Sequence, residues 1–165
     1  HLHRKNSLNQ IFRIKSAKLT ANNLIADYIK KNIKNPVIIG PDEESYKWAK
    51  SVADLIKVES RILEKKRYSS YHVEVKLNKK IDLKKKNVVI VDDIVSTGHT
   101  IIEASKLLRK LGAKNICCIC VHGIFADGAL KKLNKAKIKV ISTNTLPNKL
   151  AKIDVSGVIA EALKL

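Results

Sequence analysis

Two short runs of this sequence are apolar at every position, and they constrain the fold more than any other feature. Residues 88–91 read Val-Val-Ile-Val, and residues 116–121 read Ile-Cys-Cys-Ile-Cys-Val. A strand that is apolar on both faces must be covered on both faces, which is typical of a parallel sheet enclosed by helices. With 165 residues, the chain is long enough to bury a sizeable core within one domain.

Helices and strands are predicted to alternate along the rest of the chain. Further short strands are expected over 37–39, 61–64 and 138–141, and residues 65–86 are expected to form a mobile loop or hairpin. This order predicts an α/β fold, a three-layer sandwich with a mostly parallel central sheet and helices on both faces, in a single domain over 1–165. The predicted helices cover 19–33, a segment capped by Asp42 or Ser45 that runs to Ile56, 100–111, 128–135 and 155–163.

The chain is strongly basic, with 33 Lys and Arg residues against 15 Asp and Glu residues and a formal net charge of +18. Such a charge attracts nucleic acid, anionic membrane surfaces or phosphorylated small molecules. Aromatic residues make up 4% of the chain, which leaves few platforms for stacking bases, and the lysines are spread along the whole sequence. We interpret the charge as a lysine-rich solvated surface and do not expect nucleic acid as the partner.

The three cysteines lie together at 117, 118 and 120. Strand alternation would send Cys118 and Cys120 to one face of the sheet and Cys117 to the other, which does not suit a tetrahedral metal site. We therefore expect them to pack in the core as reduced thiols, as in a cytoplasmic protein. No apolar run approaches the ~20 residues of a membrane span, so no membrane is expected as a partner.

The segment after the strongest predicted strand combines three features that suit a phosphorylated sugar. Asp92 and Asp93 end the strand, residues 96–98 (Ser-Thr-Gly) form a small turn, and a helix follows from about Thr100, with the spacing of a capping box to Glu103. Backbone N–H groups of the turn and the positive end of the helix dipole can hold a phosphate. The two carboxylates can accept hydrogen bonds from a ribose diol or hold Mg²⁺ through water.

Residues 91–100 (Val-Asp-Asp-Ile-Val-Ser-Thr-Gly-His-Thr) resemble the phosphoribosyl-pyrophosphate (PRPP) motif of the type I phosphoribosyltransferase fold. Five further segments occur in the order seen in ribose-phosphate pyrophosphokinases, the PRPP synthases, and their sequences are similar to those of the archaeal branch. They are 40–45 (Gly-Pro-Asp-Glu-Glu-Ser), 63–68 (Leu-Glu-Lys-Lys-Arg-Tyr), 121–125 (Val-His-Gly-Ile-Phe), 142–147 (Ser-Thr-Asn-Thr-Leu-Pro) and 152–156 (Lys-Ile-Asp-Val-Ser). The similarity runs over nearly all of the chain.

The resemblance implies a pyrophosphoryl transferase. Enzymes of this family transfer the β,γ-pyrophosphoryl group of Mg-ATP to the C1 hydroxyl of ribose 5-phosphate, which yields AMP and PRPP, and they form homo-oligomers. Lys65 and Arg67 match the family's catalytic Lys-x-Arg element on a flexible loop. A lysine point charge beside a guanidinium fork suits a transition state that spreads negative charge over the transferred group.

The resemblance also assigns the ligand-binding residues. Asp92 matches the acid that binds the ribose, and His99 stands where the family most often has Gly. Asp42 and His3 match residues that help to hold Mg²⁺, although His1 stands where the family has Asp. The residues implied for ribose 5-phosphate are Arg67, Asp92, Asp93, Ser96, Thr97, Gly98, His99 and Thr100.

The resemblance implies that this chain corresponds to the C-terminal half of such an enzyme. The family's N-terminal domain, which supplies much of the ATP site and of the subunit contacts, is absent from it, so we expect an incomplete ATP site. One alternative is a stand-alone PRPP-dependent phosphoribosyltransferase, whose nucleobase hood could come only from residues 1–18. The other is a non-catalytic phosphoribosyl-binding or nucleic-acid-binding regulator, which a net charge of +18 permits.

Overall fold

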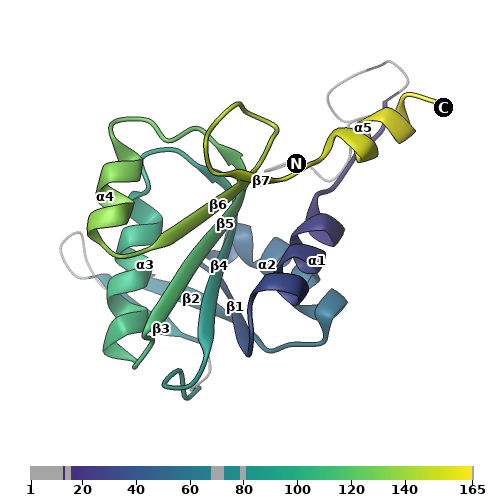
Figure 1. Cartoon of the computed structure of the whole chain (residues 1–165). Helices are drawn as coiled ribbons and strands as arrows, with labels where there is room; N and C mark the ends of the chain where they lie inside the picture. Colours follow the sequence, from purple (N-terminus) through teal and green to yellow (C-terminus); the bar gives the residue numbers. More distant parts are fainter. Residues whose placement is uncertain (1–12, 14–15, 68–72, 79–80, 165) are drawn as a thin grey trace.

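The computed structural model describes residues 13, 16–67, 73–78 and 81–164 (Figure 1). Within them, strands and helices alternate except at two places where strands follow one another without a helix. The elements are α1 (Asn22–Asn32), β1 (Pro36–Gly40), α2 (Glu43–Ile56), β2 (Ser60–Arg67), β3 (Val73–Leu77), β4 (Asn87–Val95), α3 (His99–Lys110), β5 (Asn115–Gly123), α4 (Ala129–Lys135), β6 (Lys139–Thr143), β7 (Ala151–Ile153) and α5 (Ser156–Ala162).

The strands form one seven-stranded sheet in the order β3-β2-β1-β4-β5-β6-β7. Every neighbouring pair is parallel except β2 and β3, which pair antiparallel. The chain leaves β1 toward β2 on one side, whereas β4 pairs with β1 on the other side, so the strand order switches between β1 and β4. In open α/β sheets, ligands bind beyond the carboxyl ends of the strands at such a switch point.

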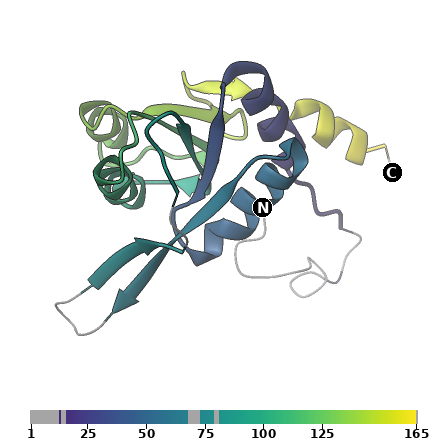
Figure 2. The same ribbon diagram turned by 90° about the horizontal axis from the view of Figure 1, so that it is seen from below.

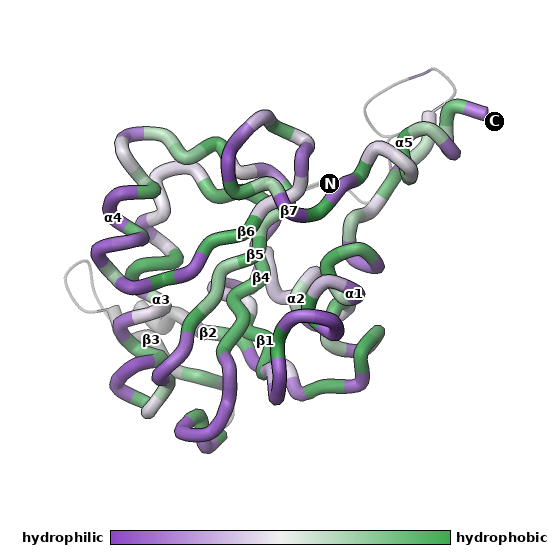
Figure 3. Tube along the Cα trace, in the orientation of Figure 1, coloured by the Kyte–Doolittle hydropathy of each residue, from purple (hydrophilic) through white to green (hydrophobic). Residues whose placement is uncertain are grey.

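Helices cover both faces of the sheet, which confirms the predicted three-layer α/β sandwich. α3 and α4 lie on one face, and α1 and α2 lie on the other (Figures 1 and 2). Because side chains alternate along a strand, Val88 and Ile90 of β4 pack with the first pair of helices, whereas Val89 and Val91 pack with the second. The apolar colouring of Figure 3 follows these central strands. No helix of the described residues is long and apolar enough to cross a membrane.

The cysteines follow the predicted alternation. Cys118 and Cys120 lie in the core beneath α3 and α4, whereas Cys117 lies in the core beneath α1 and α2. All three are free and buried. Burial raises the pKa of Cys117 to about 11 and that of Cys120 to about 12. The prediction of core packing is therefore confirmed.

The segment after β1 and α2 contains the hairpin that was one of its two predicted alternatives. β2 extends through Arg67 and pairs antiparallel with β3, so residues 65–67 belong to this hairpin and not to a loop. Only Ser60 to Ile62 pair with β1, while Leu63 to Arg67 pair with β3 alone. The two strands therefore extend together away from the body of the molecule, as Figure 2 shows. β7, a three-residue edge strand, was not predicted, because so short a segment carries no readable alternation.

Candidate functional site

The candidate site lies at the carboxyl ends of β1 and β4. The two strands pair from Pro36↔Asn87 to Ile39↔Ile90, and β1 ends one residue later. β4 continues to Val95, so Asp92 and Asp93 lie beyond the end of β1 and next to the turn that leads into α2. The sequence placed both carboxylates on the last residues of this strand, whereas in the structure β4 continues past them through Ile94 and Val95.

Ser45 joins the start of α2 to the end of β4. Its backbone N–H donates to Oδ1 of Asp42 (2.8 Å), which caps the helix, and its hydroxyl donates to Oδ1 of Asp92 (2.7 Å). Ser45 is 3% exposed and Asp92 is 7% exposed, so the bond between them is shielded from water. The capping by Asp42 was predicted, but the contact to Asp92 was not, because the two residues lie 47 positions apart.

The environment of Asp92 favours ligands that neutralise or donate to a carboxylate. Burial, together with the nearby carboxylates of Asp93 and Asp42, raises the pKa of Asp92 to about 7, although the hydrogen bond from Ser45 opposes the shift. Oδ1 of Asp92 also accepts from the backbone N–H of Asp93 (3.0 Å). A sugar hydroxyl or a divalent cation would relieve this crowding of negative charge.

The turn between β4 and α3 exposes backbone groups at the same carboxyl ends of the strands. Ser96 and Thr97 are exposed, and Gly98 is the N-cap of α3, with φ at 74° and no side-chain cap. The predicted capping box is therefore wrong: Thr100 is already the second residue of α3, which begins at His99. Since no side chain caps the helix, its first N–H groups can serve an anion, as predicted for a phosphate.

Two of the predicted site residues are described only in part, and a third is not described. Lys65 and Arg67 lie on β2, where they pair with Val75 and Val73, and the structure describes their backbone alone. His3 lies outside the described residues. Among the residues that are described, no three His, Cys, Asp or Glu side chains cluster in the manner of a protein-only metal site. The roles of Lys65, Arg67 and His3 stay predictions.

His122 of β5 lies next to the candidate site. It pairs with Ile94 across β4 and β5, and its Nδ1 lies 3.0 Å from Oγ1 of Thr145. Burial lowers the pKa of His122, and the carboxylate of Asp93 opposes that shift. His122 and Thr145 line a small cavity of about 160 Å³. The half-buried ring therefore forms part of the lining of this cavity and is held by Thr145.

Comparison with known proteins shows the family of the chain. The sequence matches the phosphoribosyl transferase domain family over residues 7–157. It is 41% identical to a ribose-phosphate pyrophosphokinase of Pyrococcus furiosus over 79% of this chain and 47% of that protein. It is 38% identical to the enzyme of the same name from Methanothermobacter thermautotrophicus over 97% of this chain and 56% of that protein.

The fold is likewise similar to a solved structure of the same kind. A phosphoribosylpyrophosphate synthetase from Mycobacterium smegmatis superposes with a TM-score of 0.73 at 27% identity, over 87% of this chain and 49% of that one. The chain therefore spans about half the length of the curated relatives and of this structure.

Proposed function

The chain belongs to the phosphoribosyl transferase domain family, and from this premise we propose that it carries the ribose 5-phosphate site and the catalytic strand of a ribose-phosphate pyrophosphokinase. The observation that carries the proposal is the buried Asp92, held by Ser45 beside the uncapped start of α3. Relatives with that name, at 33–41% identity, favour this activity over a stand-alone phosphoribosyltransferase or a non-catalytic regulator.

In the proposed reaction, ribose 5-phosphate binds across the ends of β4 and α3. Its phosphate accepts from the backbone of residues 96–100, and its ribose hydroxyls donate to Asp92, with Asp93 beside it. The C1 hydroxyl oxygen forms a bond to the β-phosphorus of ATP and its proton passes to solvent, the bond between that phosphorus and the α,β-bridging oxygen breaks, and AMP leaves. Lys65 and Arg67 supply positive charge to the transferred group, because this transition state needs placement and cations more than a covalent nucleophile.

Magnesium is the cofactor of the proposed reaction. The donor set fits it, since Asp42 and Asp92 interact electrostatically at one edge and Mg²⁺ usually takes one or two carboxylates together with substrate phosphates. When bound, the ion would neutralise phosphate oxygens of the substrates, with Asp42 and His3 as the ligands that the family resemblance implies.

We extend the proposal to the setting of the enzyme. The three buried free thiols support a reducing compartment such as the cytoplasm. The resemblance to the family supports a homo-oligomer, which sedimentation of the chain, alone and together with an N-terminal domain, would test.

Titration calorimetry with ribose 5-phosphate tests the binding half of the proposal. We expect saturable binding by the chain, loss of that binding in Asp92→Ala, and unchanged binding in Asp54→Ala. Asp54 is a suitable control because it is exposed on α2 and pairs with Lys50. Absence of binding by the folded chain would remove the proposed site.

Release of AMP from ATP, Mg²⁺ and ribose 5-phosphate tests the catalytic half. The assay uses the chain together with the N-terminal domain of the Pyrococcus furiosus relative supplied in trans. Lys65→Ala and Arg67→Ala should each lower turnover by about 100-fold or more, as expected for a lost transition-state charge. Lys66→Ala, a change of the same type between them, should not. Equal activity in all three variants would refute the catalytic assignment.

A further inference from the structure

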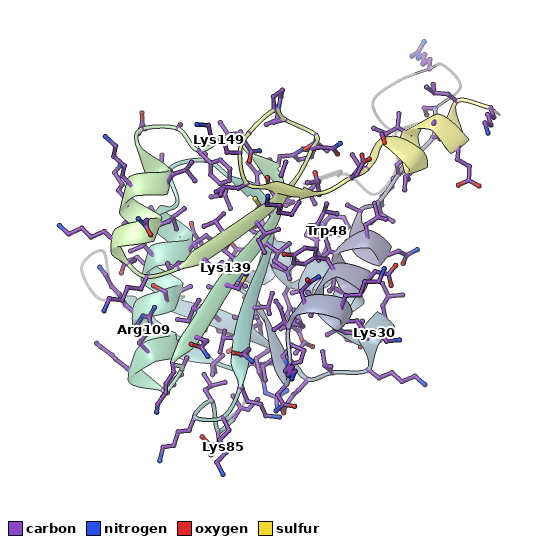
Figure 4. All side chains as sticks on the ribbon, in the orientation of Figure 1. Lys30, Trp48, Lys85, Arg109, Lys139 and Lys149 are labelled. Carbon is purple, nitrogen blue, oxygen red and sulfur yellow. The ribbon has the colours of Figure 1, made fainter. Side chains whose placement is uncertain are left out.

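A basic cleft of about 710 Å³ lies across the amino ends of the central strands, whereas Asp92 lies toward their carboxyl ends. It is lined by the first residues of β4 and β5, by the start of β6 and by the segments that follow α1, α3 and α4. Its five cations are Lys34, Arg109, Lys114, Lys137 and Lys139; Figure 4 labels Arg109 on α3 and Lys139 on β6.

The charges of this basic cleft are not balanced within the part of the chain that the structure describes. No acidic residue of that part lines the cleft. The ion pairs between described residues lie elsewhere, at Lys50–Asp54, Arg61–Glu59 and Lys106–Glu103. Like charges confined to one concave surface repel each other, so the folded chain carries a cost here that an anionic ligand would relieve.

Hydrogen bonds fix the framework that carries these cations. The Arg109 guanidinium donates to the carbonyls of Lys114 (3.1 Å), Ala136 (3.1 Å) and Lys137 (3.0 Å), so it ties together the segments after α3 and α4. Because all three acceptors are neutral carbonyls, none of these hydrogen bonds pairs Arg109 with a carboxylate. These bonds therefore hold in place the backbone that carries Lys114 and Lys137.

The floor of the basic cleft is polar and also bonded. Nδ2 of Asn115 donates to Oδ1 of Asn87 (3.0 Å), and Nδ2 of Asn87 donates to the carbonyl of Lys34. These two asparagines are paired in register at the starts of β5 and β4. Amide groups held in this way offer further polar contacts to a ligand that the lysines attract.

Helix dipoles do not account for the lysines of the basic cleft. Parallel α/β folds bring the negative ends of their helices to this edge, and cations in the last turn complement them. Those positions are already filled by other residues: Lys30 and Lys31 in α1, Lys110 beside Arg109 in α3, and Lys132 and Lys135 in α4. Lys34, Lys114 and Lys137 come after the helices end and are additional to this set.

We propose that the basic cleft binds a small oligophosphate, a ligand with at least two linked phosphate groups. Several ammonium groups and one guanidinium suit phosphate oxygens, and the volume is that of a small-molecule site. No aromatic side chain lines the cleft, so phosphate groups and not a stacked base would provide the recognition. Since the cleft and Asp92 lie at opposite ends of β4, the ligand would not compete with ribose 5-phosphate; this inference does not rest on the proposed function.

Inorganic tripolyphosphate is the probe, titrated at physiological ionic strength with ribose 5-phosphate in excess to occupy the opposite edge. The cleft variant is Lys34→Gln, Lys114→Gln, Lys137→Gln. The matched control removes the same charge at three exposed positions outside the cleft: Lys30→Gln, Lys149→Gln, Lys164→Gln. We expect saturable binding, at least about tenfold weaker in the cleft variant and nearly unchanged in the control, because only the former loses phosphate-pairing cations.

Nuclear magnetic resonance gives the location, since the side-chain amides of Asn87 and Asn115 should shift on binding. A parallel titration with a nucleoside triphosphate separates two sources of the same chemistry. Affinity equal to that for tripolyphosphate indicates recognition of phosphate groups alone, and tighter binding indicates a nucleotide; both results support the proposal.

Equal weakening of tripolyphosphate binding in the cleft variant and in the control variant would overturn the proposal in favour of diffuse charge. Shifts confined to residues 96–100, or saturable binding of duplex DNA but not of tripolyphosphate, would overturn it as well.

Discussion

Asp92 shows how a single carboxylate can be costly for folding and useful for binding. Burial raises its pKa to about 7, and the hydrogen bond from Ser45 and the N–H of Asp93 offset only part of the penalty. A ligand that donates hydrogen bonds or positive charge to this side chain recovers some of that free energy. Because the fold alone does not fully offset this penalty, we expect a hydrogen-bond donor or a cation to bind at Asp92.

The raised pKa of Asp92 predicts a pH dependence of stability. Between its ordinary pKa of 3.8 and about 7, the folded chain keeps a proton that the unfolded chain has released. The free energy of unfolding therefore falls as the pH rises through this window. In Asp92→Asn, which keeps an acceptor for Ser45, that fall should be smaller. Urea denaturation in metal-free buffer across the window measures it.

The comparison between Asp92→Asn and the parent chain also removes the contribution of His122 to the pH dependence of stability. Burial lowers the pKa of His122, so its protonation favours the unfolded chain, and stability rises as the pH rises toward its ordinary value of 6.5. Both proteins contain His122, so its contribution is common to both. Parallel pH profiles for the two proteins would contradict the assignment of the shift to Asp92.

Gly98 predicts a second effect at the scale of one residue. Its φ is 74°, and a Cβ would lie 3.1 Å from the side chain of Leu133. Gly98→Ala should lower the free energy of unfolding by about 1–3 kcal/mol, from left-handed backbone strain and crowding. Ribose 5-phosphate should also bind more weakly, because the start of α3 would shift. Gly157→Ala is the control, since a Cβ there meets no atom within 4 Å.

Among the elements, α2 and β4 are coupled through one serine. Ser45→Ala removes the hydroxyl that donates to Asp92 and leaves a buried carboxylate oxygen with fewer partners. We expect a loss of about 1–3 kcal/mol in stability, as for a buried group whose partner is removed. Affinity for ribose 5-phosphate should fall about tenfold, which corresponds to roughly 1.4 kcal/mol.

Ser51→Ala separates stability from site geometry on the same helix. The Ser51 hydroxyl accepts from Nδ2 of Asn22, away from Asp92, at 3.0 Å. This variant should lose stability and keep its affinity for ribose 5-phosphate, as measured by calorimetry. If both serine variants lost affinity equally, the bond between Ser45 and Asp92 would have no special role.

The elements also show what could be predicted from the sequence. The apolar runs 88–91 and 116–121 gave the central strands and the alternation of the cysteines, because periodicity is a local property. Residues 65–67 could be predicted only as part of a loop or a hairpin, since their strand character arises from pairing with β3 and not from an apolar face. The capping box failed because Gly98, through a left-handed φ, starts α3 before Thr100.

The site divides in the same way. The apolar run 88–91 indicated where Asp92, Asp93 and the Ser-Thr-Gly turn lie, although β4 continues past the two carboxylates to Val95. The contact of Ser45 with Asp92 depends on how α2 packs against β4, and no local pattern records such a contact between distant segments. The contact of His122 with Thr145 is of the same kind.

For the whole molecule, the polarity of the parallel sheet separates charge. Its carboxyl edge gathers Asp42, Asp92 and Asp93, and its amino edge carries the lysines of the basic cleft. The net charge of +18 is therefore not uniform around the fold. The two ends of the strands therefore suit anionic ligands in different ways. At the carboxyl end, backbone N–H groups and a cation held by the carboxylates would contact the ligand, and at the amino end the lysine side chains would do so.

The sheet also separates two cores, and the cysteines test whether the cores unfold together. Cys117 lies on one face, and Cys118 and Cys120 lie on the other. Burial and raised pKa values make all three nearly unreactive as thiolates at about pH 8, so a thiol reagent should label them only after the chain opens. If the molecule opens as one cooperative unit, the labelling of both faces should depend equally on urea concentration.

Two variants isolate the faces for this measurement. Cys118→Ala with Cys120→Ala leaves the thiol beneath α1 and α2, and Cys117→Ala leaves the pair beneath α3 and α4. Labelling rates, corrected for the stability of each variant, should show the same urea slope, because β4 and β5 contribute side chains to both cores. A shallower slope for Cys117 alone would mean that α1 and α2 detach while the candidate site at the start of α3 stays folded.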